Sequence, residues 1–266
     1  MNNSFAINFN RSNHKGKIEI DSKINDACKV LRTNGFVILD EIIDSTLIEN
    51  FNNNFNNKYC DEYIKNNSLE VGYKRYLHSF KLEGVFLNKL IYANPVVMAL
   101  IYKFLGKKAI IENLGIVQSQ PGAKRQHVHR DGEFLFDDYS TDGQGSLSFM
   151  LPAHALSVVF PLTKQSKNIG NTSFFPATHR CKRWHDITPL EPVVKQGSCV
   201  IWDYRLAHSG NANKTQSNRN ILIITYSRSW WKDNKNYEKY KQKRVNIDAK
   251  NLCKIPKKFK NLFKFI

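Results

Sequence analysis

The sequence lacks the features of disulfide-rich secreted proteins and of membrane-spanning proteins. Its five cysteines are scattered and contain no Cys-x-x-Cys pair, which argues against a disulfide framework and predicts a reducing compartment. No stretch approaches the roughly 20 continuous apolar residues of a membrane span. The first 17 residues contain no apolar segment of the kind found in secretory signals. We therefore expect a cytoplasmic protein.

The chain is also short of acidic residues, with 23 Asp and Glu against 40 Lys and Arg, which gives a net charge of +17. Such an excess predicts anionic partners, namely phosphate-bearing small molecules, nucleic acid or an acidic membrane surface. A proteome rich in lysine and asparagine explains the same composition equally well. Because the sequence has no RNP-like motif and no zinc-finger spacing, nucleic acid is the least favoured partner. Nothing in the sequence predicts an oligomeric state.

The part of the chain before residue 106 predicts mostly helices. Apolar residues recur at helical spacing over residues 21–31, and Gly35 fits the position just past a helix end. Residues 36–39 form an apolar run that predicts a buried strand. Asp44 is placed to cap a second helix, and residues 86–105 predict further helix with a break at the Asn-Pro pair inside it.

The chain changes character after residue 108, where short runs rich in Val, Ile, Phe and Thr are separated by Gly, Asn and Pro. These runs predict strands at residues 109–118, 156–162, 172–175, 199–206 and 221–226. Residues 66–84 have a mixed pattern that predicts no element. Helices followed by strands argue against a doubly wound sheet. We expect a mainly β fold with flanking helices: a double-stranded β-helix, or jelly-roll barrel, with N-terminal helices packed on it.

These patterns divide the chain into a loose N-terminal arm at 1–17, a single domain at 18–229 with its barrel at about 109–229, and a basic extension at 230–266. The extension holds 12 Lys and Arg against 3 acidic residues. Its apolar residues would share one helical face: Ile255, Phe259, Leu262, Phe263 and Ile266. Such a helix either lies on a membrane surface or packs on the barrel, and packing is the commoner arrangement.

Three polar sites along the strands suggest a metal centre. His129 and Asp131 form a His-x-Asp pair, whose side chains in a strand point to the same side. His208 follows the predicted strand 198–207 and continues its inward row of side chains. Arg219 opens the next strand, and an antiparallel return would bring it back beside His208. Two imidazoles and a carboxylate suit Fe(II) with open positions, and the arginine suits a carboxylate ligand.

With these residues in view, the chain resembles the phytanoyl-CoA dioxygenase family of Fe(II)/2-oxoglutarate oxygenases from about Gly35 to Trp230. Four segments in the family's order carry the resemblance: 34–37 (NGFV), 121–131 (PGAKRQHVHRD), 170–179 (GNTSFFPATH) and 197–219 (GSCVIWDYRLAHSGNANKTQSNR).

The resemblance implies roles for individual residues. His129, Asp131 and His208 match the family's iron ligands, and Arg219 matches the arginine that binds the far carboxylate of 2-oxoglutarate. Further matches are to positions that contact the co-substrate: Gln126, Thr172 and, more weakly, Phe160. The implied cofactors are Fe(II), 2-oxoglutarate and O2. His127 shares a face with His129 and fits either a cavity residue or a substitute ligand.

Three departures from the family pattern concern the co-substrate pocket. Gly170-Asn171 stands where Asn-Gly is usual, residues 176–179 read PATH where PGSH is usual, and Gly210 stands where some members have serine. They leave the three iron ligands unaffected.

The resemblance implies oxidation of an aliphatic C–H in a small molecule, with release of succinate and CO2. The carboxylate of Asp131 leaves no room for a halide ligand, which favours hydroxylation over halogenation. The net charge suggests an anionic, lipid-linked or sugar-linked substrate. Two alternatives remain at this point: a jelly-roll protein that binds metal or ligand without turnover, and a peripheral membrane oxygenase acting on a glycolipid.

Overall fold

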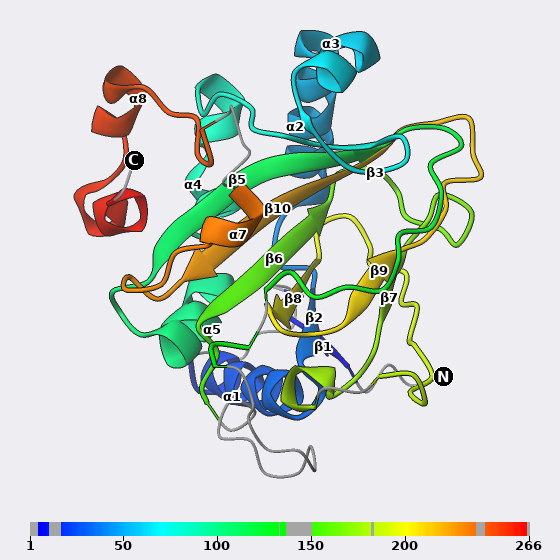
Figure 1. The fold of residues 1–266 in the computed structure, drawn as a ribbon. Helices are drawn as coiled ribbons and strands as arrows, with labels where there is room; N and C mark the ends of the chain where they lie inside the picture. Colours follow the sequence, from blue (N-terminus) through cyan, green and yellow to red (C-terminus); the bar gives the residue numbers. More distant parts are fainter. Residues whose placement is uncertain are drawn as a thin grey trace.

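The computed structural model describes residues 5–10, 17–132, 134–136, 151–181, 184–237 and 243–264. Within these residues, eight strands form one large sheet in the order β1-β2-β8-β6-β10-β5-β4-β3, and β7 pairs with β9 in a small sheet (Figure 1). The strands are β1 (Ala6–Asn8), β2 (Phe36–Asp40), β3 (Leu69–Gly72), β4 (Arg75–His78), β5 (Ile110–Ser119), β6 (Ala155–Pro161), β7 (Thr172–Phe174), β8 (Cys199–Asp203), β9 (His208–Gly210) and β10 (Arg219–Ser227).

Helices precede most of the strands, as expected, and begin and end at recognisable residues. Gly35 ends the first helix with φ +80°, a conformation that glycine adopts at little cost. The side chain of Asp44 accepts a hydrogen bond from the Thr46 amide and caps the second. The helices are α1 (Lys17–Asn34), α2 (Ser45–Lys58), α3 (Asp61–Asn66), η2 (Gly84–Leu87), α4 (Lys89–Tyr92), α5 (Pro95–Leu105), η3 (Thr178–Arg180), α7 (Asn234–Tyr237), α8 (Ala249–Cys253) and η4 (Lys257–Phe263).

The two faces of the large sheet bury different sets of side chains because successive residues of a strand point to opposite sides. On β10, Leu222, Ile224 and Tyr226 face the main core beneath the helices. Ile221 and Ile223 alternate with them and line a cavity on the other face. The strands thus carry a helix-packed outer face and an inner face that is free for a site.

Two stretches differ from the expectation. Within the N-terminal arm, Ala6–Asn8 form β1, which pairs in parallel with β2, and Phe9 is 2% exposed. A loose arm is therefore wrong for these residues, because the edge of the sheet binds them. The stretch 66–84, for which no element was predicted, supplies β3 and β4, and both line the inner face.

The strand that was expected to carry His208 ends earlier. β8 stops at Asp203, a turn follows in which the Leu206 amide donates to the Asp203 carbonyl, and His208 begins the separate β9. Arg219 does not return beside β9, since β10 pairs with β5 and β6. The prediction of one strand with an adjacent return is wrong, and the two residues instead belong to two different sheets.

The basic extension packs on the domain. Ile255, Leu262 and Phe263 are no more than 3% exposed, and the rings of Phe259 and Phe263 meet Tyr92 edge-on. Of the two arrangements considered for this segment, the structure has the packed one, built as a short α-helix and a 3-10 helix. Among the described residues, no helix has the length and apolarity required to cross a bilayer.

Candidate metal centre and co-substrate cavity

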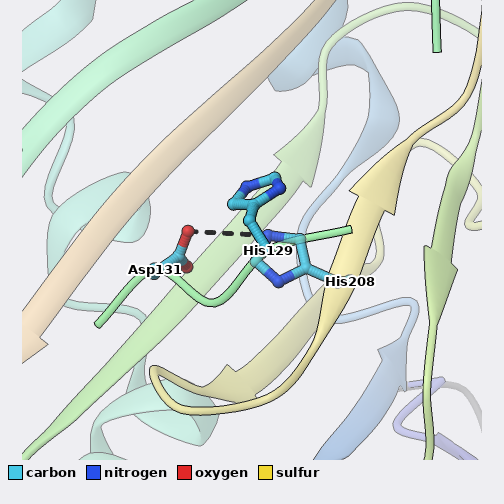
Figure 2. A group of neighbouring side chains, drawn as sticks. All are labelled: His129, Asp131 and His208. Carbon is cyan, nitrogen blue, oxygen red and sulfur yellow. Dashed lines mark ion pairs between the residues drawn. The ribbon is translucent and has the colours of Figure 1, made fainter. Parts of the chain in front are cut away.

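The side chains of His129 and Asp131 converge with that of the distant His208 on the inner face (Figure 2). One ligand atom each from His129, Asp131 and His208 lies within 4.8 Å of the others, and they are the metal-binding group found among the described residues. Reciprocal backbone hydrogen bonds of 3.0 and 2.9 Å join His129 to His208. Asp131 Oδ1 lies 3.5 Å from His208 Nε2. We call these three residues the triad.

Contacts with backbone carbonyls determine which ring nitrogen of each histidine in the triad can bind a metal. Nδ1 of His129 lies 3.0 Å from the His127 carbonyl, and Nδ1 of His208 lies 3.0 Å from the Leu206 carbonyl. A carbonyl only accepts, so each Nδ1 carries the proton and each Nε2 keeps its lone pair. Burial and the neighbouring His208 lower the pKa of His129, which favours the neutral form that binds metals.

The carboxylate of Asp131 is fixed on one oxygen and free on the other. Ser157 Oγ and Trp202 Nε1 each donate to Oδ2 over 2.8 Å. Asn236 in α7 donates to the Asp131 backbone carbonyl over 2.6 Å. Oδ1, which faces the imidazoles, is thereby left as the ligand atom. This arrangement of oriented donors around a ligand is typical of metal sites.

Arg130, between the two ligands of the His-x-Asp pair, anchors the loop on the other side. Its guanidinium lies 4.4 Å from the centre of the Trp184 ring and donates to the carbonyls of Thr178, Cys181 and Arg205. Because Arg130 gives its donors to these carbonyls, the loop is fastened to the surrounding turns while His129 and Asp131 face the cavity.

Arg219 reaches the cavity from the large sheet and meets the small sheet. Its side chain is 3% exposed, and it donates to Gln165 Oε1 over 3.0 Å and to Thr172 Oγ1 over 3.2 Å. Burial lowers the pKa of Arg219 to about 9, so the group is still charged at neutral pH. Among the described residues no carboxylate pairs with Arg219, although a buried charge normally needs an anion.

A second buried arginine, which sequence reasoning missed, lies at the same end. Arg75 on β4 and Arg219 on β10 both pair with Ser119 of β5. Arg75 is 1% exposed, its Nε has no partner, and its Nη2 donates to the carbonyls of Lys124 and Asn211. Burial lowers its pKa to about 10. Its segment gave no recognisable strand pattern, and no signal in the sequence separated Arg75 from the many surface cations.

The departure at position 210 has a steric reason. A Cβ at Gly210 would lie 2.5 Å from Arg75 Nη1 and 2.6 Å from Gln126 Oε1. The amide of Gln126 also spans two backbones, since Nε2 donates to the Val71 carbonyl over 2.7 Å and Oε1 accepts from the Gly210 amide over 3.0 Å. Glycine at 210 therefore makes room for both side chains.

The cavity has a volume of about 270 Å³. Its lining includes the triad, Arg219, Thr172, Gln126, Arg75 and His127, whose side chain is otherwise exposed. Phe160 is not brought to it: this residue is fully buried in the helix-facing core, because its neighbour Val159 takes the inner face. Of the two roles considered for His127, the structure supports that of a cavity residue, since the metal-binding group contains His129 in its place.

The fold is that of known iron and 2-oxoglutarate enzymes. The epimerase SnoN of nogalamycin biosynthesis, solved with Fe3+, alpha ketoglutarate and nogalamycin RO, is 16% identical, with a TM-score of 0.61 over 79% of this chain and 85% of SnoN. HygX from Streptomyces hygroscopicus, solved with nickel and 2-oxoglutarate, is 12% identical, with a TM-score of 0.59 over 77% of this chain and 87% of HygX. The prediction of a double-stranded β-helix is confirmed.

Two curated fungal proteins match part of the sequence. Dioxygenase af480 of Aspergillus fumigatus is 24% identical over 139 residues, and dioxygenase FrzG of Cladobotryum is 25% identical over 111 residues. The matches cover 50% and 38% of this chain but only 42% and 34% of the relatives, so the chain spans less than half of their length. A family model described as phytanoyl-CoA dioxygenase (PhyH) matches residues 31–221, well over half of the 266 residues. The chain belongs to the phytanoyl-CoA dioxygenase family.

Proposed function

We propose that the protein is an Fe(II)- and 2-oxoglutarate-dependent oxygenase that hydroxylates an aliphatic C–H of a small molecule. The observation that supports this most is that one cavity holds both the triad and a buried arginine for which the described residues provide no carboxylate partner. 2-Oxoglutarate suits both features. It can chelate a metal ion that has open positions and, because it is a dicarboxylate, it can also pair with a buried cation.

The donor set fits Fe(II). His129 and His208 would bind through Nε2 and Asp131 through Oδ1, which gives two imidazoles and one carboxylate on one side of the ion. A structural zinc site has four protein ligands, often thiolates, and no open position. No such site is found among the described residues. When bound, the iron supplies activation of O2 coupled to decarboxylation of 2-oxoglutarate.

The co-substrate's far carboxylate would pair with Arg219, with Thr172 as a second donor. Arg75 adds positive charge at the same end, and Gln126 lines the cavity between this end and the triad. Because Gln126 already bonds two backbone groups, its role is to shape the wall through the Val71 and Gly210 backbones. The arginines remain solvent-excluded, which strengthens their attraction for an anion.

The surrounding residues orient the Asp131 carboxylate and supply an apolar wall. Trp202 and Ser157 fix the plane of the Asp131 carboxylate, so this ligand position stays filled by oxygen and is closed to a halide. The apolar side chains of Leu77, Val117 and Ile223 line the same cavity and offer a non-polar surface along which a C–H group could approach the metal. This arrangement supports hydroxylation as the outcome.

The test uses protein reconstituted anaerobically with Fe(II) and exposed to ¹⁸O2 with 2-oxoglutarate and a library of small molecules. We expect a substrate to gain one labelled oxygen with wild-type protein and with the exposed-residue control Asp26→Ala, and to gain none with Asp131→Ala. A protein that binds Fe(II) and 2-oxoglutarate but oxidises nothing and forms no succinate would be the non-catalytic binding protein instead.

A further inference from the structure

We propose that Asn113 and Thr225 form a hydrogen-bonding site for a neutral oxygen of the substrate, a hydroxyl or a carbonyl group. The inference rests on the proposed oxygenase function, because it names the substrate class that this same cavity would accept. The site lies in the same row of paired residues as the side chains that donate to Asp131, away from the two buried arginines.

The strand register places Asn113 and Thr225 in one row with residues at the metal end of the cavity. Trp202 of β8 pairs with Ser157 of β6, Ser157 pairs with Thr225 of β10, and Thr225 pairs with Asn113 of β5. The first two residues of this row are those that donate to Asp131. Neighbouring strands lie about 4.8 Å apart, so Asn113 is about 10 Å from Ser157 along the row. A small molecule that presents a C–H to the metal can span this distance.

The side chain of Asn113 is built for a partner that the protein does not provide. It is 2% exposed and lines the cavity, and its Nδ2 has no hydrogen-bond partner. Thr225 opposite it is 1% exposed and lines the same cavity. A buried amide donor that is left unsatisfied is destabilising and uncommon. A ligand oxygen within the cavity would satisfy it.

A β-bulge directs Asn113 inward. The register between β10 and β5 shifts after Thr225, since Tyr226 pairs with Ile111 and Glu112 is left as the extra residue. The carboxylate of Glu112 accepts from the Asp233 amide and pairs with Arg244, so it is engaged within the protein. Bulges are common beside active sites, where they re-aim a side chain. The bulge therefore separates a carboxylate that has partners within the protein from an amide that lines the cavity.

The charge around Asn113 selects a neutral group. Arg75 and Arg219 flank Ser119, six residues along β5, which corresponds to about 20 Å at the rise of a strand. Arg130, the other arginine of the lining, gives its donors to backbone carbonyls. Thr225, which pairs with Asn113, and Ile223, the next lining residue of β10, are uncharged, and the charged lining residue at the metal end is the acidic Asp131. A carboxylate or phosphate at Asn113 would therefore lose its hydration without a counter-charge.

The test is a binding measurement by NMR on ¹⁵N-labelled protein loaded with Zn(II) and 2-oxoglutarate. Cyclohexanol, cyclohexanone and cyclohexanecarboxylate serve as probes that share one ring and differ in the polar group. The side-chain amide signal of Asn113 is identified by its loss in Asn113→Leu. We expect both neutral probes to shift this signal saturably. The carboxylate should bind at least about 10-fold more weakly, because it would lose its hydration without a counter-charge.

Two variants and a control complete the experiment. Asn113→Leu should weaken both neutral probes by about 10-fold, whereas the exposed-residue control Asn53→Leu should leave them unchanged. Asn113→Asp, which nearly preserves the shape, should keep cyclohexanol and lose cyclohexanone, because a carboxylate accepts but does not donate. This second variant tests the site even where the leucine variant folds poorly.

Three results would overturn the proposal: tighter binding of the carboxylate than of the ketone, full affinity for the ketone in Asn113→Asp, or a loss of 2-oxoglutarate affinity in the Asn113 variants that places this residue in the co-substrate site. Succinate formation by Fe(II)-loaded wild-type protein is measured in parallel without probes. Its absence would refute the oxygenase function, whereas its presence with failed probe binding would refute this site alone.

Discussion

Removal of the indole donor to Asp131 should weaken metal binding. In Trp202→Phe the ring stays apolar and continues to pack against Phe174 and His208, whose ring centres lie 5.5 and 5.1 Å from that of Trp202. What is lost is the 2.8 Å hydrogen bond from Nε1 to Asp131 Oδ2, which leaves Ser157 as the donor to that oxygen. The carboxylate then has more freedom to rotate away from the metal.

The magnitude follows from the charge on the acceptor. A hydrogen bond to a charged group contributes about 1.5–3 kcal/mol, which corresponds to about 10- to 150-fold in affinity. Variants of groups that orient metal ligands typically lose 10- to 100-fold. We therefore expect the Fe(II) dissociation constant of Trp202→Phe to rise by about 10- to 100-fold.

The assay is an anaerobic titration of metal-free protein with Fe(II), followed by calorimetry or by the absorption of the Fe(II)–2-oxoglutarate complex. Trp230→Phe is the matched control, because Trp230 is 64% exposed and lies outside the cavity lining. Ser157→Ala should give a similar loss. If Trp202→Phe folds normally and binds Fe(II) as tightly as wild type, the hydrogen bond does not orient Asp131 and the reasoning is refuted.

Three further predictions concern the cavity and its support. Arg219→Gln should raise the KM for 2-oxoglutarate by 100-fold or more, on the order of a lost charge-assisted bidentate contact, and an unchanged KM in steady-state succinate assays would contradict the pairing. Gly210→Ala should displace the Arg75 guanidinium, with about 1–3 kcal/mol lost in chemical unfolding and weaker 2-oxoglutarate binding; wild-type values for both would show that the space is not needed. Burial lowers the pKa of His154 to about 4, so the folded state binds this proton less readily than the unfolded state, and stability should fall as the pH drops from about 6.5 towards 4. His154→Phe should flatten that part of a pH-dependent unfolding series, and an unchanged slope would contradict the assignment.

Much of the fold follows from local patterns in the sequence. The cap at Asp44, the glycine that ends α1 and the β-branched runs of β5, β6 and β10 are visible without any tertiary information. β3 and β4 are not visible, because their short alternating runs are interrupted by charged and polar residues. β1 is stabilised by pairing with β2, a contact between segments about 30 residues apart that no local pattern indicates.

The sequence predicts which residues form the candidate site, but not how the strands that carry them are connected. His129, Asp131 and His208 were named from the sequence, and the structure brings them together. The route by which His208 and Arg219 reach one cavity was wrong, because the turn after Asp203 transfers the chain from the large sheet to the small one. Such a switch between sheets depends on three-dimensional packing, which spacing along the chain does not encode.

Residues that support the site were missed for a related reason. Trp202 and Ser157 look like ordinary strand residues in the sequence, and their relation to Asp131 arises only when β8 and β6 pair beneath the loop. Phe160 shows the converse: it was placed in the cavity by resemblance, but the alternation of β6 turns it to the core. A shift of one residue along a strand decides which face a side chain occupies.

The most direct test of the account is the release of ¹³CO2 from 2-oxoglutarate labelled at C1, measured in air with Fe(II)-loaded protein. We expect Fe(II)-dependent release matched by succinate in wild-type protein. In Asp131→Ala we expect release no higher than in the metal-free control, because the carboxylate ligand that completes the triad is gone. Release at the wild-type rate in Asp131→Ala would contradict the assignment of the metal centre, and so would its absence from wild-type protein that binds both Fe(II) and 2-oxoglutarate.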